Sequence, residues 1–292
     1  MKTPQWIKGL LWTSPWWLGF VLFLAGPMAI SAYLSFCDYP LLQPPVFVGL
    51  DNYTRLATDP IFHKVLYNTF IYAAFSIPLG TVLAVLLATL LNRNVRFQAI
   101  FRACIFVPTI VPIVAVAMVW MWMLNPEFGL INEGLRILRI EGPLWLASPR
   151  WAMTSLILVS LWIIGGPVVI YLAGLQEISS SLYEAARIDG ASTIRQFWHV
   201  TLPGLSPVIL FNVIVGIIAT WQVFALPFVM MKASPGPDRS TYFYTMYLFD
   251  NAFRYLKMGY ASAMAWIQLL IILALTGIVL YLSRRMVHYR GA

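Results

Sequence analysis

Long uninterrupted apolar stretches, separated by shorter polar segments, are the dominant pattern of this chain. Six stretches contain no Asp, Glu, Lys or Arg: 16–36, 66–91, 103–124, 152–175, 205–229 and 260–283. A helix needs about 20 apolar residues to cross the hydrocarbon core of a bilayer. The pattern therefore predicts an all-α, polytopic membrane protein: one transmembrane domain over residues 1–292, with six transmembrane helices.

Several predicted spans contain proline, which removes a backbone hydrogen bond and kinks a helix. The triplet Gly165-Gly166-Pro167 lies near the middle of the fourth span. Transport proteins often break a helix at this depth, but a simple packing kink fits the triplet equally well. The sequence leaves both interpretations open.

The composition agrees with a membrane protein and excludes a soluble one. Of the 292 residues, 60% are hydrophobic and only 10% are charged, against about 25% charged in a typical soluble domain. The net charge is +8, but the basic residues are scattered over the ends of the apolar stretches, where membrane topology places them. Membrane lipid is therefore the expected surrounding, and nucleic acid is not an expected partner.

The orientation is predicted mainly from the short segments. Lys and Arg divide almost equally between the two sides, whereas only three acidic residues fall on the side of the N-terminus: Glu177, Glu184 and Asp189. The short turn 92–102 carries three arginines, and Arg284-Arg285 begins the C-terminal tail, which is typical of an inner face. We expect cytoplasmic N- and C-termini, with the first apolar stretch retained as a span because it is longer than the apolar region of a signal peptide.

The polar segment 176–204 differs from the other connections because it is amphipathic. A first short helix should end at Asp189-Gly190, since glycine adopts the left-handed conformation without strain. Ser192 can cap a second helix, and Pro203 should end that helix before the fifth span. The apolar stripe of the second helix consists of Ile194, Phe197, Trp198 and Val200. The pattern predicts a cytoplasmic helix–turn–helix between spans four and five.

The residues of this segment resemble a known motif. The matching positions are Glu184, Ala185, Ala186, Asp189, Gly190, Ala191, Phe197, Leu202, Pro203 and Pro207. They are similar to the EAA loop of binding-protein-dependent ABC importer permeases.

The resemblance extends over nearly the whole chain. Residues 47–53, Asp59-Pro60, Asn68-Thr69, Ala252-Phe253 and 258–263 are similar to carbohydrate-importer permeases of the maltose and glycerol-3-phosphate type, in the first of the two permease subunits. One departure concerns the family's Thr-x-Gly-Gly-Pro run after the fifth span. Here residues 232–237 read Lys-Ala-Ser-Pro-Gly-Pro, which leaves the geometry of this outer loop and the identity of the substrate open.

The resemblance implies that the helical elbow docks in a groove of a cytosolic ATPase subunit, where Glu184 pairs with a basic residue and Gly190 sets the elbow angle. It also implies a second homologous permease subunit, two ATP-binding subunits and an extracytoplasmic solute-binding protein, in the inner membrane of a bacterium or archaeon. The residues alone also allow an amphipathic helix on the lipid surface. Three acidic residues facing an anionic leaflet argue against that alternative.

The chain itself lacks an energy source. No span carries an acid for an intramembrane proton relay, and no GxxxxGK[ST] motif is present for ATP binding. There is no Cys/His cluster with metal-ligand spacing, so neither a metal nor a cofactor is expected. We therefore expect a non-enzymatic permease subunit whose ATP hydrolysis takes place on a partner.

Two alternatives come from other functional classes. A membrane enzyme that modifies lipid or glycan would have to use the outer acids Glu127, Glu133 and Glu141, which are spread through a loop containing Gly and Pro. A stand-alone secondary carrier is disfavoured by the uncharged spans. The three histidines, His63, His199 and His288, fall in connections or the tail and are expected at the surface.

The candidate substrate-pathway residues are aromatic and amide side chains inside the last three spans: Trp162, Asn212, Trp221, Gln222, Trp266 and Gln268. Flat aromatic faces with amides suit a sugar, although a buried Trp also serves as core and a Gln also ties helices together. No basic residue lies at mid-membrane to bind a phosphate, which favours an uncharged saccharide.

Overall fold

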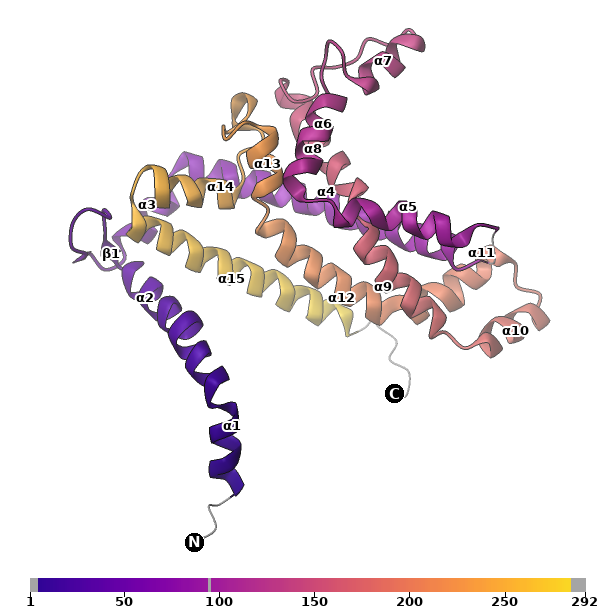
Figure 1. The fold of residues 1–292 in the computed structure, drawn as a ribbon, viewed down its shortest axis with the longest axis horizontal. Coiled ribbons are helices and arrows are strands. Elements are labelled where there is room, and N and C mark those ends of the chain that lie inside the picture. Colours follow the sequence, from indigo (N-terminus) through magenta and orange to yellow (C-terminus); the bar gives the residue numbers. More distant parts are fainter. Residues whose placement is uncertain (1–4, 94–95, 285–292) are drawn as a thin grey trace. The chain divides into compact units, whose positions relative to one another are not determined.

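The computed structural model describes residues 5–93 and 96–284, and most of this part is helical (Figure 1). The α-helices are α1 (Gln5–Phe20), α2 (Gly26–Leu34), α3 (Asp51–Thr58), α4 (Pro60–Leu91), α5 (Gln98–Ile110), α6 (Ile113–Met123), α7 (Leu130–Ile137), α8 (Pro149–Trp162), α9 (Gly165–Gln176), α10 (Ser180–Ile188), α11 (Thr193–Gln196), α12 (Leu202–Trp221), α13 (Ala225–Met230), α14 (Tyr244–Phe249) and α15 (Met258–Ser283). The π-helical segments are η1 (Val21–Ala25), η2 (Phe197–Thr201) and η4 (Asp250–Arg254), and η3 (Pro237–Arg239) is a 3-10 turn. The strands β1 (Cys37–Asp38) and β2 (Val46–Phe47) pair antiparallel.

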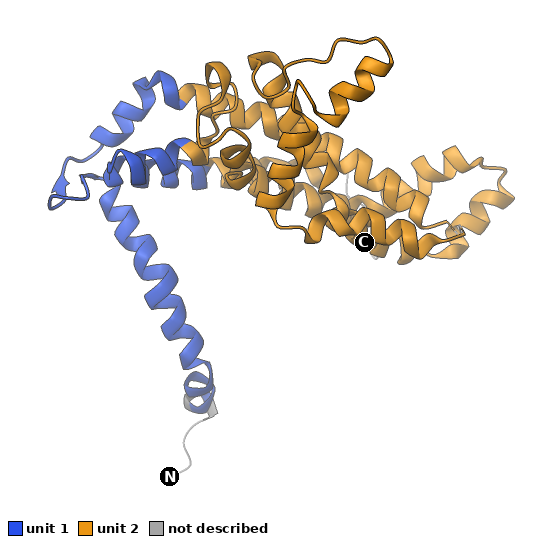
Figure 2. Ribbon diagram, turned by 45° about the horizontal axis from the view of Figure 1, so that its top comes forward, with its two compact units in different colours: residues 1–62, 247–270 blue, residues 63–246, 271–292 orange. Residues whose placement is uncertain are grey.

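The chain divides into two compact units (Figure 2). Unit 1 consists of residues 1–62 and 247–270, and unit 2 consists of residues 63–246 and 271–292. Of the three histidines, His63 and His199 are exposed, as expected. Arg285 and His288 lie outside the described residues.

The predicted spans appear as single helices or as bent pairs. Four helices are long and apolar enough to cross a membrane: Lys8–Leu34, Pro60–Leu91, Thr193–Trp221 and Met258–Ser283. Two further helix pairs meet the same criterion together, α5 with α6 at a bend of 102° and α8 with α9 at a bend of 46°. The described part of the chain therefore has four to six candidate spans, and the all-helical membrane fold is confirmed.

The two bends lie where proline or glycine weakens the helix. Val111 is extended (ψ 132°) because Pro112 follows it, so residues 103–124 form two helices instead of one. The second bend lies immediately before Gly165-Gly166-Pro167. At this triplet the structure favours a helix break over a slight kink.

One sequence expectation about the fifth span is wrong. Pro203 does not end the helix that begins at Thr193, which continues to Trp221. The proline follows directly after the π-helical turn η2, where the N–H of Leu202 donates to the carbonyl of Phe197. Such a wide turn absorbs a missing hydrogen bond without ending the helix. The helix then ends earlier than the expected position 229, and Ala225–Met230 forms the separate helix α13.

The core of unit 2 joins three of its helices. Its buried residues are Ala84, Val85, Ala88 and Leu91 of α4, Val168, Tyr171, Leu172 and Leu175 of α9, Ile178, and Leu205 of α12. Small residues let the backbones approach closely. At Gly174 of α9, a Cβ would lie only 2.8 Å from Cγ2 of Val208 on α12. Because of this contact, α9 and α12 pack as neighbours.

The start of α9 is pressed against α5. A Cβ on Gly165 would lie 2.4 Å from the carbonyl oxygen of Ile105 and 3.0 Å from Cα of Phe106, whereas a Cβ on Gly166 would meet nothing within 4 Å. We expect Gly165→Val to destabilise the protein by about 1–3 kcal/mol, because the backbone of α5 must shift. Gly166→Val is the matched control and should lower the stability much less. Thermal unfolding in detergent measures the stability of both variants. Equal unfolding midpoints would contradict the close contact between Gly165 and the backbone of α5.

Unit 1 is held together by a polar network near its small hairpin. Asn52 of α3 is buried, and its Nδ2 donates to the carbonyls of Ser35 (3.0 Å) and Cys37 (2.8 Å). The start of α15 lies against the same segment, since a Cβ on Gly259 would be 1.9 Å from the Cys37 oxygen. These contacts fix the residues after α2 against the start of α15.

A second network in unit 1 is built on Asp59, the residue before α4. Its Oδ2 accepts hydrogen bonds from the hydroxyls of Tyr247 (2.5 Å) and Tyr260 (2.7 Å), and its Oδ1 accepts one from the N–H of Ile61 (2.8 Å). Burial alone would raise the pKa of the Asp59 carboxyl, but the hydrogen bonds from Tyr247, Tyr260 and the backbone outweigh burial and hold its pKa below the ordinary value. Burial, followed by the Asp59 carboxylate, raises the pKa of Tyr247 to about 12.

We expect Asp59→Asn to lower the thermal stability at pH 7 by about 1–3 kcal/mol, because charge-assisted hydrogen bonds are lost. A depressed carboxyl pKa contributes stability above the unfolded-state pKa, and this contribution disappears as the pH falls through the folded-state pKa. The difference between wild type and variant should therefore shrink in acid, below the ordinary pKa of 3.8. Asp51→Asn, which removes an exposed pair with Arg55, is the control and should have little effect at any pH. A constant difference at all pH values would refute the network.

Candidate functional site

The segment between α9 and α12 forms a helical elbow in unit 2. Helix α10 ends at Ile188, Gly190 has a φ of +75°, and α11 begins at Thr193. Ser192 caps α11, since its Oγ accepts the N–H of Arg195 (3.4 Å). No atom lies within 4 Å of a Cβ built on Gly190, so its backbone angle, not space, requires glycine there.

The elbow is tied to the core of unit 2. The hydroxyls of Tyr183 on α10 and Thr201 on η2 are hydrogen-bonded at 3.0 Å. Nε2 of Gln196 donates to the carbonyl of Ala191 (2.9 Å) across the turn. Tyr183 and Phe197 also pack against the buried cluster formed by α4, α9 and α12. The elbow is therefore an ordered element attached to the helices.

The residues singled out from the sequence occupy two settings in this elbow. Glu184, Ala185, Asp189 and Gly190 are exposed, and Ala186, Ala191 and Phe197 are half-buried. Leu202, Pro203 and Pro207 belong to α12 and are half-buried. Ile188 (87% exposed) and Ile194 (73%) add exposed apolar side chains. The exposed part of the elbow thus carries the Glu184 carboxylate, the small side chain of Ala185 and the apolar side chains of Ile188 and Ile194.

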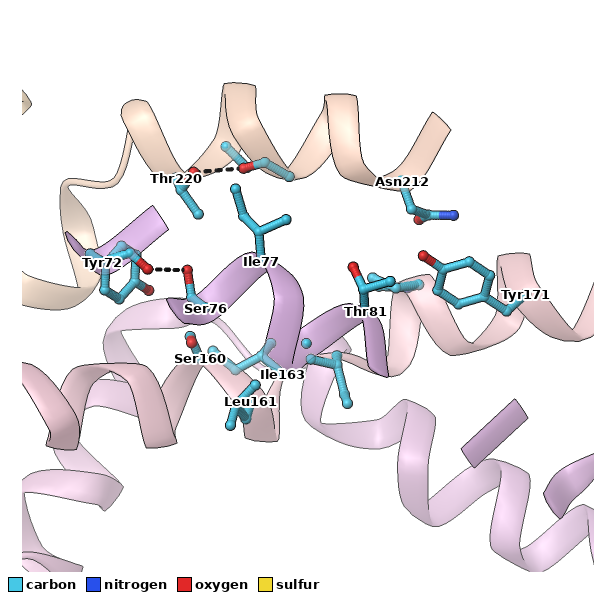
Figure 3. A pocket seen from close by; sticks show the side chains of 15 residues that line it. Tyr72, Ser76, Ile77, Thr81, Ser160, Leu161, Ile163, Tyr171, Asn212 and Thr220 are labelled. Carbon is cyan, nitrogen blue, oxygen red and sulfur yellow. Dashed lines mark hydrogen bonds between the residues drawn. The ribbon is translucent and has the colours of Figure 1, made fainter. Parts of the chain in front are cut away.

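A cavity of about 210 Å³, lined by both apolar and hydroxyl-bearing side chains, lies in unit 2 between α4, the bend of α8 and α9, and α12 (Figure 3). Its polar lining consists of Tyr72, Ser76 and Thr81 of α4, Ser160 of α8, Tyr171 of α9, and Asn212 and Thr220 of α12. None of its 15 lining residues is charged. Hydroxyls, an amide and two tyrosine rings can bind a neutral polyhydroxylated molecule by hydrogen bonds and ring contacts.

Tyr171 is the residue that marks this cavity most clearly. Its side chain is fully buried, and Figure 3 shows its hydroxyl facing that of Thr81. Within the described residues, however, the Tyr171 hydroxyl has no partner at full hydrogen-bond geometry. Buried polar atoms normally have such a partner in the protein, in water or in a ligand. The cavity therefore has unused hydrogen-bonding capacity.

Of the six predicted pathway residues, Asn212 lines this cavity and the other five do not. Trp162 lines an apolar groove along α5, and its ring packs edge-on against that of Trp120, with 5.9 Å between the ring centroids. Trp221 is 3% exposed, and its ring lies 6.2 Å from that of Tyr244. Gln222 is exposed at the end of α12. The two remaining residues, half-buried Trp266 and buried Gln268, belong to α15 in unit 1.

Sequence reasoning did not single out the hydroxyls of the cavity. Tyr72, Ser76, Thr81, Ser160, Tyr171 and Thr220 are ordinary residues of apolar spans when taken singly. The available signal was the stripe Asn212, Gly216 and Thr220, whose spacing of four places small and polar residues on one face of a helix.

Comparison with known proteins identifies the family. A family model described as "Binding-protein-dependent transport system inner membrane component" matches residues 76–288. The chain belongs to this family. It is an ABC transporter permease subunit, which confirms the family that the sequence resembles.

Similar proteins cover almost the full length of the permease. It is 38% identical to the probable ABC transporter permease protein YesP of Bacillus subtilis (strain 168), over 98% of this chain and 93% of that protein. It is 33% identical to the sulfoquinovosyl glycerol transport system permease protein SmoG of Agrobacterium fabrum, over 90% and 86%. Its fold is similar to a chain in the crystal structure of a bacterial alginate ABC transporter in complex with an alginate pentasaccharide-bound periplasmic protein, with a TM-score of 0.82, 22% identity, and coverage of 96% and 94%.

Proposed function

We propose that this permease forms half of the membrane pathway through which an ABC importer takes up an uncharged sugar or oligosaccharide. The other half is a second homologous permease subunit, two ATP-binding subunits supply the energy, and an extracytoplasmic solute-binding protein delivers the solute. The complex lies in the inner membrane of the cell, with both termini of this chain in the cytoplasm. The observation that carries the proposal is the continuity between the exposed elbow and the helix that lines the cavity.

This continuity gives a route from ATP hydrolysis to the solute. The helix that begins at Thr193 in the elbow continues to Trp221, and its residues Asn212 and Thr220 line the cavity. Packed helices move as rigid bodies and not as soft springs. A displacement of the elbow by an ATP-binding subunit would therefore move one wall of the cavity.

The cavity supports the choice of solute. Its lining is uncharged and carries hydroxyls from four helices, which suits the many hydroxyls of a sugar. Its volume of about 210 Å³ lies below the roughly 300–1,000 Å³ of common ligand sites, so it accommodates one sugar unit of a larger solute. The relative named for sulfoquinovosyl glycerol and the fold neighbour from the alginate transporter support a saccharide as the class of solute. Both named solutes are acidic, so the choice of an uncharged solute rests on the uncharged lining of the cavity alone.

The proposed ATP-binding partners follow from what the chain lacks. The six apolar stretches carry no charged residue, and the sequence has no GxxxxGK[ST] motif. An intramembrane proton relay needs ionisable residues, and ATP binding by such loops needs that motif. Energy must therefore enter from another subunit, and the elbow is an exposed, ordered and core-attached segment that can receive it.

Affinity purification of the chain from its native membrane, followed by reconstitution, tests the proposal. We expect a second permease and an ATP-binding protein to purify with it. Proteoliposomes that contain the complex and the solute-binding protein should accumulate a neutral oligosaccharide only when ATP is present. Uptake by the isolated chain, driven by a pH gradient, would instead identify a secondary carrier and overturn the proposal.

A further inference from the structure

The cavity between α4, α8, α9 and α12 has two polar ends (Figure 3). Asn212 and Thr220 line opposite ends and are roughly 12 Å apart along α12, since a helix rises 1.5 Å per residue. Because α12 continues from the elbow, Asn212 marks the end nearer the elbow. We call this end, with Thr81, Tyr171 and Asn212, the elbow end. The far end carries Tyr72, Ser76, Ser160 and Thr220.

The aliphatic hydroxyls of the far end have already donated their hydrogens. Oγ of Ser76 and Oγ of Ser160 each lie 2.6 Å from a carbonyl oxygen in the preceding turn of their own helix, and Oγ1 of Thr220 lies 2.8 Å from one. A carbonyl oxygen can only accept, so each hydroxyl gives its single hydrogen to its own helix and keeps only lone pairs. Toward the cavity, these three hydroxyls are therefore hydrogen-bond acceptors.

The elbow end has a different hydrogen-bonding character. The Tyr171 side chain is fully buried, and its hydroxyl has no partner at full hydrogen-bond geometry within the described residues. Figure 3 shows this hydroxyl facing that of Thr81. Asn212 gives one amide hydrogen to the carbonyl of Val208 (3.0 Å), and an amide has a second hydrogen and a carbonyl oxygen besides. This end can therefore donate as well as accept.

The stretch between the two ends is apolar. A Cβ on Gly216 would lie 3.6 Å from Cγ1 of Ile77, and a Cβ on Gly80 would lie 3.8 Å from Cδ2 of Leu161. The glycines thus leave room beside two aliphatic side chains and bring no polar side chain of their own. A molecule in the cavity is consequently held by hydrogen bonds at its ends and by apolar contact in the middle.

This arrangement is complementary to hydroxyl groups rather than to acids. A sugar hydroxyl has both a hydrogen and lone pairs, so it can bond to either end of the cavity. A carboxylate has no hydrogen for the acceptors of the far end, and its burial without a cationic partner is unfavourable. Sites with buried polar groups discriminate strongly against analogues that leave those groups unpaired.

We propose that Tyr171 is a specificity-determining residue of the solute pathway. Its O–H donates to an oxygen atom of the sugar, while hydroxyls of the same sugar donate to the three acceptors of the far end. The different character of the two ends fixes the direction in which the sugar lies in the cavity. This inference rests on the proposed function and deepens it, because it names the groups of the solute that are recognised.

The first test removes the hydroxyl of Tyr171. It uses the complete transporter in proteoliposomes with its solute-binding protein, and the saccharide that accumulates fastest from a panel of neutral gluco-, galacto-, xylo- and arabino-oligosaccharides. We expect Tyr171→Phe to lower kcat/KM for uptake at least tenfold. The thermal unfolding midpoint should stay at the wild-type value, because this hydroxyl makes no full hydrogen bond within the described residues. Tyr67→Phe is the matched control, since Tyr67 is 62% exposed on α4, and should leave uptake unchanged.

The second test separates the two ends by the chemistry of the solute. In a deoxyfluoro saccharide, fluorine replaces one hydroxyl and has no hydrogen to donate. At the position that donates to Thr220, fluorination should lower wild-type uptake. Thr220→Val should then lower uptake of the parent saccharide and cause no further loss with this fluorinated form, as expected for coupled partners. Tyr171→Phe should still lower uptake of the fluorinated form at least tenfold, because it acts at the other end.

The possible outcomes separate this inference from the proposed function. Wild-type uptake by Tyr171→Phe would show that water satisfies the hydroxyl and would overturn the inference, while the proposed function would stand. A large fall in the unfolding midpoint of this variant would also overturn it, since the hydroxyl would then stabilise the fold. Equal losses in Thr220→Val for the parent and every fluorinated saccharide would refute the acceptor role of the far end. If the wild-type complex accumulates no saccharide, the proposed function fails and this inference fails with it.

Discussion

Reversing the charge at Glu184 is expected to abolish ATP-driven uptake while the permease still inserts and folds. Glu184 is exposed on α10, and the small side chain of Ala185 next to it is exposed as well. If it pairs with a basic residue of the ATP-binding subunit, Glu184→Lys leaves two cations facing each other. Loss of one partner of a buried interfacial charge pair costs about 2–5 kcal/mol. The amount of ATP-binding subunit that purifies with the permease should fall accordingly.

A neighbouring substitution controls for the change in charge. Glu177 is also exposed and lies at the end of α9, before α10, so Glu177→Lys makes the same charge change outside α10. It should leave uptake and co-purification near the wild-type level. Normal uptake by Glu184→Lys would show that the elbow does not couple this permease to its ATPase through Glu184.

Filling the cavity between α4, α8, α9 and α12 is expected to lower uptake as strongly, because it blocks the solute and not the coupling to the ATPase. Gly216 lines the cavity from α12, and a Cβ there meets only Ile77 at ordinary contact distance, 3.6 Å. A phenylalanine ring at this position would occupy much of the cavity of about 210 Å³. We expect Gly216→Phe to lower the uptake rate at low solute concentration at least about tenfold, which corresponds to about 1.4 kcal/mol. The ATP-binding subunit should still purify with this variant.

The control for Gly216→Phe is the same substitution at Gly277 of α15. A Cβ at Gly277 meets nothing within 4 Å, so Gly277→Phe adds the same bulk to a helix without entering the cavity. Uptake by Gly277→Phe should remain near wild type. If Gly216→Phe transports as well as Gly277→Phe, the cavity is not part of the solute pathway.

The apolar stretches were sufficient to predict the membrane helices, because a helix in lipid must be apolar over a fixed length. Two features of the elbow that depend on single residues were also predicted: the left-handed turn at Gly190 and the helix cap at Ser192. The helix breaks were harder to predict. Pro112 breaks its helix and Pro203 does not, and a π-helical turn precedes Pro203. Pro78 and Pro108 also lie inside continuous helices, so a proline in the sequence does not by itself locate a break.

The cavity could not be predicted because it depends on how helices face one another. Trp221 was a reasonable candidate from its position in the span, but it packs into the protein beside Tyr244. The cavity instead uses hydroxyls such as those of Thr81 and Tyr171, which come from different helices. A single sequence shows the face of one helix but does not show which helix lies opposite.

Several residues that carried the family resemblance have structural roles in this molecule. Oδ2 of Asp59 accepts hydrogen bonds from the hydroxyls of Tyr247 and Tyr260. Nδ2 of Asn68 donates to two backbone carbonyls at the end of the loop after α13. Gly259 allows the start of α15 to reach the carbonyl of Cys37. The resemblance therefore includes residues that build the fold as well as residues of the elbow.

Cysteine cross-linking at the elbow tests most directly the claim that this permease is driven through its contact with an ATP-binding subunit. Ala185→Cys would be introduced in a background in which the exposed Cys104 is changed to serine. A thiol reagent that carries a photoactivatable group would be attached to the new cysteine in the assembled complex and activated by light. We predict a cross-link between Cys at position 185 and the ATP-binding subunit, which disappears when Glu184 is changed to lysine. A complex with full transport activity that gives no such cross-link, while the ATP-binding subunit can be cross-linked elsewhere on this chain, would contradict the account.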